Sequence, residues 1–395
     1  MTYRFIATAD WHADSDPVKS RKLEASLGEM VDYCLQFKVN AIIISGDIWE
    51  RKQNYAEKSG VPLVVNYLRR LSKLVDYILI TKGNNAHDEP GSVSLLHQLE
   101  PNIYAYEYPV VLAVGKTVTD ILRHKTREEI NYIVSMVPYP TKANFITETS
   151  IDNNNADFLQ KFESVFELIG ERTEEYYYPK ILAFHGNVVG SRLSSGQSLV
   201  SQDIMVAPST LEKAKHNYYA LGHIHLRQVI KPYMLYSGSI YNKSWGETER
   251  KSFEELTFNK WEHWNLSHSD VQFETGRPMA TVECKLLSDG SLEVSSDCPG
   301  LECDESKYQY RARVRVAEAD KKLINEHLTA NLKDLFFEDV KIEINIIPSE
   351  RDSRSEQIMN CKTLNDEVNE YAAVINEPVN GTIAAKVSMI QEAQL

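Results

Sequence analysis

Ala41-Ile42-Ile43-Ile44-Ser45-Gly46-Asp47 is a continuous apolar run that ends in a glycine and an acid. Such a run is typical of a strand buried on both faces of a parallel sheet. Apolar runs at 3–9 and 77–81 lie on either side, and segments with helical periodicity at 20–37 and 58–74 separate the three. This strand–helix order predicts an α/β fold, in which ligands bind at the carboxyl ends of the strands.

Strand-like runs continue after this first half of the fold. We expect strands at 104–114, 131–138, 180–184 and 217–221, a helix at 155–170 and a hairpin at 228–240. A series of strands after an α/β half indicates a second sheet that packs on the first. The first domain is therefore expected to span residues 1–270.

The pattern of polar and apolar residues changes after residue 270. Strands with alternating polarity at 279–287, 308–316 and 340–347, with a helix at 319–335, predict a small α+β domain over 271–348. A polar segment, Pro348–Glu356, then reads as a linker. Two apolar stripes predict a helix–loop–helix tail over 349–395; they are Leu364, Val368, Tyr371 and Ile375, then Ile383, Val387 and Ile390.

Composition limits the classes of function. The chain has 395 residues and a net charge of −13, which argues against a protein that grips nucleic acid through bulk positive potential. It leaves room for a nuclease whose bound cations offset local negative charge. No apolar run is long enough to span a membrane, and five cysteines without C-x-x-C spacing indicate reduced thiols, so we expect a cytoplasmic protein.

Side chains that ligate metals follow five of the expected strands. They are Asp10, His12, Asp47, Asn84, His185, His223 and His225. Each has an alternative interpretation, such as a helix cap for Asp47 or an exposed turn for the two histidines of Gly222-His223-x-His225. Taken together they favour a two-metal hydrolase, and their imidazole and carboxylate groups suit manganese, iron or zinc better than magnesium or calcium.

Apart from His87, the six remaining histidines lack this position after a strand. We expect them to be surface or packing residues; they are His97, His124, His216, His263, His268 and His327.

The ordered motifs resemble those of the calcineurin-like metallophosphoesterase superfamily, and most closely the SbcD-type DNA repair nucleases, including phage-encoded relatives. The start Ala9-Asp10-Trp11-His12, the stretch Gly46-Asp47-Ile48-Trp49 and the stretch Tyr236-Ser237-Gly238-Ser239-Ile240 carry this likeness. It implies a four-layer α/β/β/α sandwich with a small α+β capping domain and a helical tail that binds an SMC-like, SbcC-type ATPase. It also implies a homodimer within a heterotetramer, acting on DNA in end processing, repair or recombination in a bacterial or phage-infected cell.

The resemblance implies a role for each site residue. Asp10, His12, Asp47 and His225 would hold one divalent ion, and Asn84, His185 and His223 a second, with Asp47 bridging. Mn²⁺ is the expected metal and Mg²⁺ the alternative.

The third motif departs from the family pattern. The family has Gly-Asn-His-Asp/Glu, whereas this chain has Gly83-Asn84-Asn85-Ala86-His87-Asp88. We expect the two extra residues to bulge, so that His87 returns toward the metals and assists the leaving 3′-oxygen; the alternative is that this role is lost. A second departure is Glu50, where many relatives carry Asp or His.

Two other functions remain open from the sequence. The same dimetal site could serve a phosphatase or small-molecule phosphodiesterase. The altered third motif could also belong to a non-catalytic scaffold that only recruits the ATPase.

Overall fold

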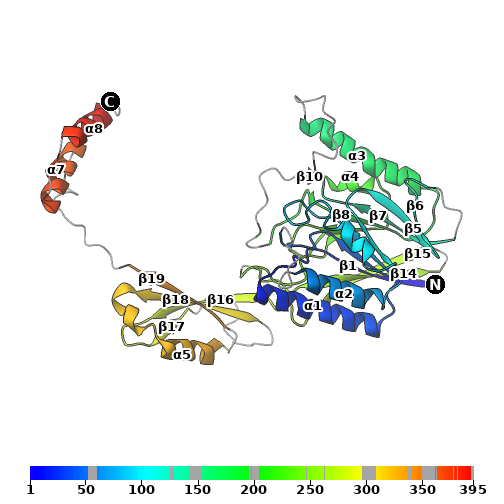
Figure 1. The fold of residues 1–395 in the computed structure, drawn as a ribbon, viewed down its shortest axis with the longest axis horizontal. Coiled ribbons are helices and arrows are strands. Elements are labelled where there is room, and N and C mark those ends of the chain that lie inside the picture. Colours follow the sequence, from blue (N-terminus) through cyan, green and yellow to red (C-terminus); the bar gives the residue numbers. More distant parts are fainter. Residues whose placement is uncertain are drawn as a thin grey trace. The chain divides into compact units, whose positions relative to one another are not determined.

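The computed structural model describes most of the chain. The described residues are 1–51, 60–124, 129–141, 154–194, 197, 204–245, 247–261, 263–295, 308–336, 340–348, 361, 363–376, 378–379 and 381–392. The expected linker over Pro348–Glu356 lies outside these residues after position 348. The described part is a mixed α/β structure, as the sequence predicts (Figure 1).

The first sheet has six strands in the order β15-β14-β1-β2-β3-β4. Their bounds are β1 Thr2–Thr8, β2 Ala41–Ser45, β3 Tyr77–Thr81, β4 Ile103–Tyr106, β14 Ser252–Lys260 and β15 Trp264–Gln272. Strands β1 to β4 are parallel, whereas β14 pairs antiparallel with β1 and with β15. The hairpin β14–β15 is absent from our sequence-based strands, because β15 alternates between half-buried and exposed residues and carries no buried apolar run.

The second sheet has seven strands in the order β12-β13-β11-β8-β7-β5-β6. Their bounds are β5 Val110–Gly115, β6 Val118–Asp120, β7 Ile130–Val137, β8 Lys180–His185, β11 Tyr218–Gly222, β12 Gln228–Lys231 and β13 Met234–Tyr236. Strands β7, β8, β11 and β13 are parallel. The single strand expected at 104–114 is wrong: it is two strands in different sheets, with Pro109 between them. Proline lacks the N–H that a continuous ladder needs.

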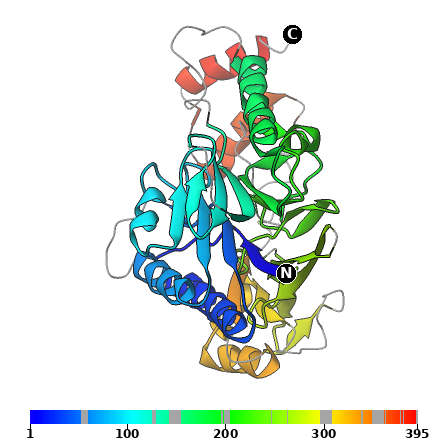
Figure 2. The same ribbon diagram turned by 90° about the vertical axis from the view of Figure 1, so that its right-hand side faces the viewer.

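Helices cover the outer face of each sheet (Figures 1 and 2). The first sheet packs on α1 (Pro17–Gln36) and α2 (Val61–Ser72), and the second on α3 (Asn154–Thr173) and α4 (Pro208–Glu212). The short elements are η1 (Ser94–Gln98), β9 (Asn187–Val188) and β10 (Met205–Val206). Asp16 caps α1 by accepting hydrogen bonds from the backbone N–H groups of Val18 and Lys19, so the helix starts just before its expected position.

The inner faces of the two sheets pack against one another. Along β2, Ile42 and Ile44 belong to the cluster under α1 and α2, whereas Ile43 belongs to the cluster between the sheets. Successive side chains of a strand point to opposite faces, so a strand between two apolar layers must be apolar throughout. In the inner cluster Phe5 packs edge-on against Tyr132 and Phe258, with ring centroids 4.8 and 5.8 Å apart.

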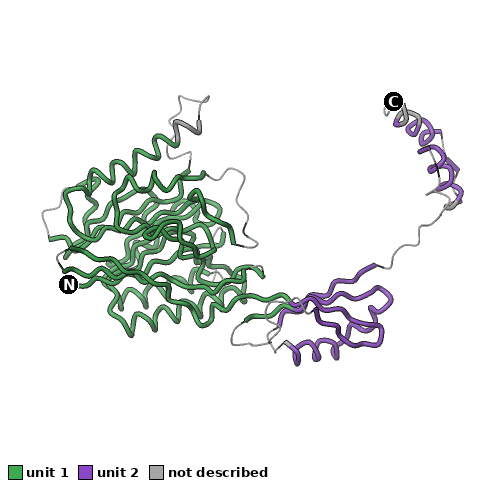
Figure 3. Tube along the Cα trace, turned by 180° about the vertical axis from the view of Figure 1, so that it is seen from behind, with its two compact units in different colours: residues 1–281, 299–311 green, residues 282–298, 312–395 purple. Residues whose placement is uncertain are grey.

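The chain divides into two compact units (Figure 3). One consists of residues 1–281 and 299–311, and the other of 282–298 and 312–395. The domain boundaries that we expect at 270 and 348 stay predictions. No described helix is both long and apolar enough to cross a bilayer.

A further sheet has four strands in the order β17-β16-β18-β19. Its strands are β16 Met279–Leu286, β17 Leu292–Val294, β18 Gln309–Ala317 and β19 Lys341–Ile347. The helix expected at 319–335 is two elements, η3 (Glu318–Leu323) and α5 (Glu326–Phe336), because Ile324 is extended and Asn325 accepts the Leu328 N–H. The tail contains α7 (Leu364–Ile375) and α8 (Gly381–Glu392).

We predict that Phe5→Ala lowers the free energy of unfolding of the first unit by about 3–5 kcal/mol, because it empties a fully buried aromatic site between the sheets. Urea denaturation followed by tryptophan fluorescence measures this change. Phe37, which is 40% exposed at the end of α1, provides the matched control Phe37→Ala, with an expected change below about 1 kcal/mol. Equal losses in both variants would contradict this assignment of the inner core.

Candidate metal centre

The predicted ligands gather where the strands of both sheets end. Asp10 and His12 follow β1, Asp47 follows β2 and Asn84 follows β3, all from the first sheet. His185 ends β8, and His223 and His225 follow β11, from the second sheet. Ser45 joins the two sheets at this edge, since its hydroxyl donates to the Ala220 carbonyl at 3.0 Å.

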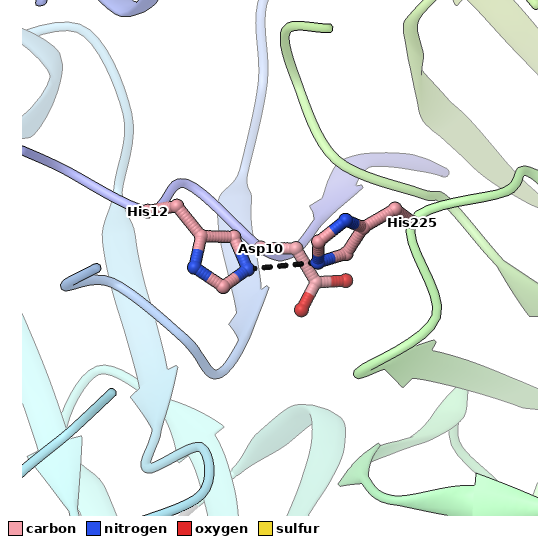
Figure 4. A group of neighbouring side chains, drawn as sticks. All are labelled: Asp10, His12 and His225. Atoms are coloured by element: carbon pink, nitrogen blue, oxygen red, sulfur yellow. Dashed lines mark hydrogen bonds between the residues drawn. The ribbon is translucent and has the colours of Figure 1, made fainter. Parts of the chain in front are cut away.

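One group comprises Asp10, His12 and His225, whose ligand atoms all lie within 4.8 Å of one another (Figure 4). The Nε2 atoms of His12 and His225 are 3.0 Å apart, and all three residues are at most 8% exposed. Two ligand atoms that bind one ion at right angles, each at about 2.1 Å, lie about 3 Å apart. The spacing of the two imidazoles therefore fits a shared cation.

Asp47 links this group to two others. It forms a cluster with His12 and His87, and another with His185 and His223. Its Oδ2 lies 3.8 Å from His12 Nε2, and its Oδ1 lies 3.3 Å from His185 Nε2. One carboxylate thus faces both histidine sets, each oxygen toward a different one.

The hydrogen bonds of the histidines determine which nitrogen faces inward. Nδ1 of His185 lies 2.6 Å from the Ser45 carbonyl, and Nδ1 of His87 lies 2.5 Å from the Glu50 carbonyl. A carbonyl only accepts, so both Nδ1 atoms carry the proton and donate it. Nδ1 of His12 lies 3.0 Å from a carboxylate oxygen of Glu50. In each case Nε2 is left to face the cluster, which is the arrangement of metal-bound histidines.

This arrangement tests whether a cation fits. His185 Nε2 is buried without a hydrogen-bond partner in the described structure, although it faces a carboxylate oxygen. A lone pair that faces a carboxylate in a dry site is unfavourable unless a proton or a cation lies between them. The residues present therefore fit a divalent transition-metal ion, with nitrogen and oxygen donors.

The backbone at the site is strained. Asp10, His12, Asp47 and His223 have positive φ angles of 54°, 45°, 52° and 100°. They are four of six such non-glycine residues in the described chain. Each costs of the order of 1–3 kcal/mol, and such residues cluster at functional sites. Hydrogen bonds between the loops stabilise these backbone conformations. The N–H groups of Asp10 and His12 donate to the carbonyls of Gly46 and Asp47, both at 3.0 Å.

Asp88 is a supporting residue that we did not identify from the sequence. Its buried carboxylate accepts the backbone N–H groups of Gly83, Asp47 and Trp49 at 2.7, 3.0 and 3.1 Å. It therefore joins the loop after β2, which contains Asp47 and Trp49, to the third motif. Burial and the nearby Asp47 raise its pKa to about 7. The sequence does contain a signal for this role, since Asp88 is the acid at the end of the third motif.

Glu50 is the second residue whose role we did not identify. Besides His12, its carboxylate contacts Lys243 at 2.7 Å and Lys19 at 3.4 Å. Burial would raise the pKa of Glu50, but the His12 hydrogen bond and Lys243 hold it well below its usual range. A charged carboxylate thus fixes the His12 ring.

The third motif brings His87 to the cluster. The Asn84 carbonyl accepts the N–H groups of His87 and Asp88 at 3.1 and 2.8 Å, which closes a turn. His87 Nε2 lies 3.9 Å from Asp47 Oδ2, and its ring centroid is 4.5 Å from that of His12. Asn85 is exposed and binds Lys82.

Asn84 reaches the site with its amide turned inward. Its Nδ2 donates to Asp47 Oδ2 at 3.0 Å, and its Oδ1 accepts the Ala86 N–H at 2.9 Å. Its Oδ1 can act as a ligand only after the amide turns over. The three groups of described residues that could bind a metal ion contain none of the histidines that we expect to be surface or packing residues.

Comparison with known proteins gives no family. No family model and no curated protein match the chain. Among solved structures, one match has 12% sequence identity, covers 69% of this chain and 100% of the other, and has a TM-score of 0.36. A likeness this weak carries no argument about fold or function.

We predict that metal affinity rises with pH. Burial lowers the pKa of His185, but Asp47 outweighs it and raises this pKa to about 9 in the cation-free protein. Since Nε2 must lose its proton to ligate, affinity should rise about tenfold per pH unit up to that value. Burial raises the pKa of Asp10 to about 6, so we expect the metal affinity to fall more steeply as the pH drops below 6. Calorimetry with Mn²⁺ in buffers of different protonation enthalpy measures the released proton; a pH-independent affinity would contradict this.

We predict that Gly83→Ala weakens Mn²⁺ binding at least tenfold, because the new Cβ would overlap Asp47 Oδ1 and its backbone nitrogen. The control is Gly28→Ala in α1, where the nearest atom is the Tyr67 hydroxyl oxygen at 3.8 Å. Calorimetry gives the affinity and circular dichroism checks the fold. Unchanged Mn²⁺ binding in the folded Gly83 variant would show that Asp47 does not have to occupy its present position.

Proposed function

We propose that this chain is a two-metal DNA exo- or endonuclease subunit that hydrolyses phosphodiester bonds with Mn²⁺, or alternatively Mg²⁺. The observation that carries the proposal is the pair of histidine groups that share the Asp47 carboxylate at the ends of strands from two sheets. The ordered motifs of the sequence support the same reaction class. We also propose that the two packed sheets and their outer helices are the four-layer metallophosphoesterase sandwich.

We propose two ion sites on these groups. Asp10, His12 and His225 would hold one ion, and His185 and His223 the other, with Asp47 between them and Asn84 completing the second site. Bound divalent cations supply Lewis-acid stabilisation of a phosphate and lower the pKa of water. The chain's own contribution is to hold these ligands on strand ends, where backbone hydrogen bonds fix their positions.

His87 is the group best placed to move a proton. Its Nδ1 is held by the Glu50 carbonyl, so its Nε2 is directed at the cluster beside Asp47. The side chain is 27% exposed, which leaves it accessible to a bound phosphodiester. Protonated at Nε2, it would donate that proton to the leaving 3′-oxygen.

We predict that the parent protein cleaves linear DNA with Mn²⁺ and that Asp47→Asn abolishes cleavage. His87→Ala should bind Mn²⁺ normally and lose about 10²–10⁴-fold in turnover, because only a proton donor is removed. His327, exposed on α5, provides the control His327→Ala with parental turnover. Cleavage is followed on end-labelled DNA and on a chromogenic phosphodiester in parallel.

The outcomes separate the three functions. Hydrolysis of the chromogenic substrate alone would indicate a phosphatase or small-molecule phosphodiesterase. No hydrolysis of either substrate by the manganese-loaded protein would indicate a scaffold with an inactive site. Parental turnover in His87→Ala would remove His87 from the mechanism.

The tail supports a proposal about the partner. Thr363 caps α7 through the Asp366 N–H, and Asn376 ends it in a left-handed conformation, so local signals define the helix. Tyr371, Ile383 and Ile390 are 49%, 44% and 48% exposed. We propose that these helices dock on an SMC-like ATPase, within a homodimeric nuclease of a heterotetramer that processes DNA ends in repair or recombination.

We predict that deleting residues 357–395 leaves Mn²⁺-dependent cleavage of short substrates intact and abolishes co-purification with the ATPase, because the catalytic groups lie before residue 226. Size-exclusion chromatography of the mixed proteins measures the complex. Retention of the complex by the truncated chain would place the ATPase contact elsewhere.

A further inference from the structure

A pocket lies at the edge of the two sheets opposite the metal ligands. It has a volume of about 460 Å³ and receives side chains from the loop after α3, the starts of β8 and β11 and the turn between β14 and β15. Six of its residues carry the argument: Tyr176, Tyr177, Lys180, Lys215, Lys260 and Trp264. Lys180 and His185 are the two ends of β8, which separates the pocket from the metal groups by about 17 Å.

The charge of the pocket is opposite to that of the chain. Its described lining has three lysines and a histidine and no acidic residue, although the chain has 56 acidic and 43 basic residues. Lys215 does pair with Glu174 at 2.9 Å, but their side chains are 58% and 67% exposed. An exposed pair of this kind is weak, so a bound anion can replace the glutamate. The pocket is therefore suited to an anionic ligand.

The aromatic side chains give the pocket a second kind of surface. Trp264 is held by its indole N–H, which donates to the Tyr177 carbonyl at 3.1 Å, and by packing on Tyr3 at a centroid distance of 5.4 Å. Lys260 Nζ lies 5.5 Å from the centre of the indole ring. Tyr177 itself is 87% exposed. Fixed or exposed rings beside lysines form a stacking surface next to positive charge.

We propose that this pocket binds a nucleotide of single-stranded nucleic acid, with the base against Tyr177 and Trp264 and the phosphate held by the lysines. The volume is within the range of about 300–1,000 Å³ that small-ligand sites have. Stacking on a side chain needs an accessible base face, which an unpaired strand offers and a duplex interior does not. The site is separate from the metal groups and does not depend on the proposed nuclease reaction.

The test uses the full-length protein in EDTA, so that neither bound cations nor cleavage contribute. Fluorescence anisotropy measures binding of a labelled oligo-dT, with unlabelled thymidine monophosphate and duplex DNA as competitors. Tyr177→Ala removes a stacking ring, and Lys260→Ala removes a charge. The matched controls are Trp261→Ala, which is 86% exposed and outside the pocket, and Lys116→Ala at an exposed turn.

We expect Tyr177→Ala to weaken oligo-dT binding by about 5- to 100-fold. Lys260→Ala should also weaken it and reduce the slope of log K against log salt by about 0.7. The controls should bind as the parent does. Competition by thymidine monophosphate at the affinity of oligo-dT would identify free nucleotide as the source of the same ligand chemistry. Parental oligo-dT binding by both pocket variants, or preferential competition by duplex DNA, would overturn the proposal.

Discussion

The position of the Asp47 carboxylate is the constraint on which the candidate site depends. Its two oxygens face histidines that come from different sheets, so the sheets must pack with their strand ends at the same level. Gly46 and Gly83 make this possible, because a Cβ on either residue would overlap His185 or Asp47 itself. The inner aromatic cluster around Phe5 then has a functional consequence, since it fixes how the two sheets pack.

The strained backbone of the site is stabilised by contacts from Asp88 and Glu50. Four of the candidate ligand residues have left-handed backbone conformations, which loops without supporting contacts would not keep. Asp88 stabilises these conformations, because it accepts three backbone N–H groups from the loops after β2 and β3. Glu50 contacts His12 at Nδ1 and fixes its ring. Asp88 is fully buried and the Glu50 side chain is 17% exposed, and hydrogen bonds or neighbouring cations offset the cost of placing each acid there. These contacts hold the Asp47 backbone and the His12 side chain in place in the cation-free protein.

The chain is acidic overall but has a local basic pocket, so its net charge does not describe the charge at a particular part of the surface. The sum of −13 describes the average surface, whereas binding depends on charges within about a Debye length of the ligand. Lys180, Lys215 and Lys260 are far apart in the sequence and meet only because the starts of β8 and β11 and the end of β14 lie at the same edge. The proposed nuclease site and the proposed nucleotide pocket thus lie at opposite ends of the same strands.

Elements whose signals are local could be predicted from the sequence alone. Strand β3 has the predicted bounds, and helix α7 begins and ends at the first and last residues of the predicted stripe, because a short apolar run and a capped, periodic stretch carry their information in neighbouring residues. The positions of the metal-ligating types after the strands were also readable, since parallel strands present their carboxyl ends on one side. Which of these residues meet depends instead on how the chain packs. The tertiary structure divided residues 104–114 between two sheets, added β14 and β15 to the first sheet, and brought His87 and Glu50 to His12. These outcomes depend on contacts between residues distant in the chain, which no local pattern encodes.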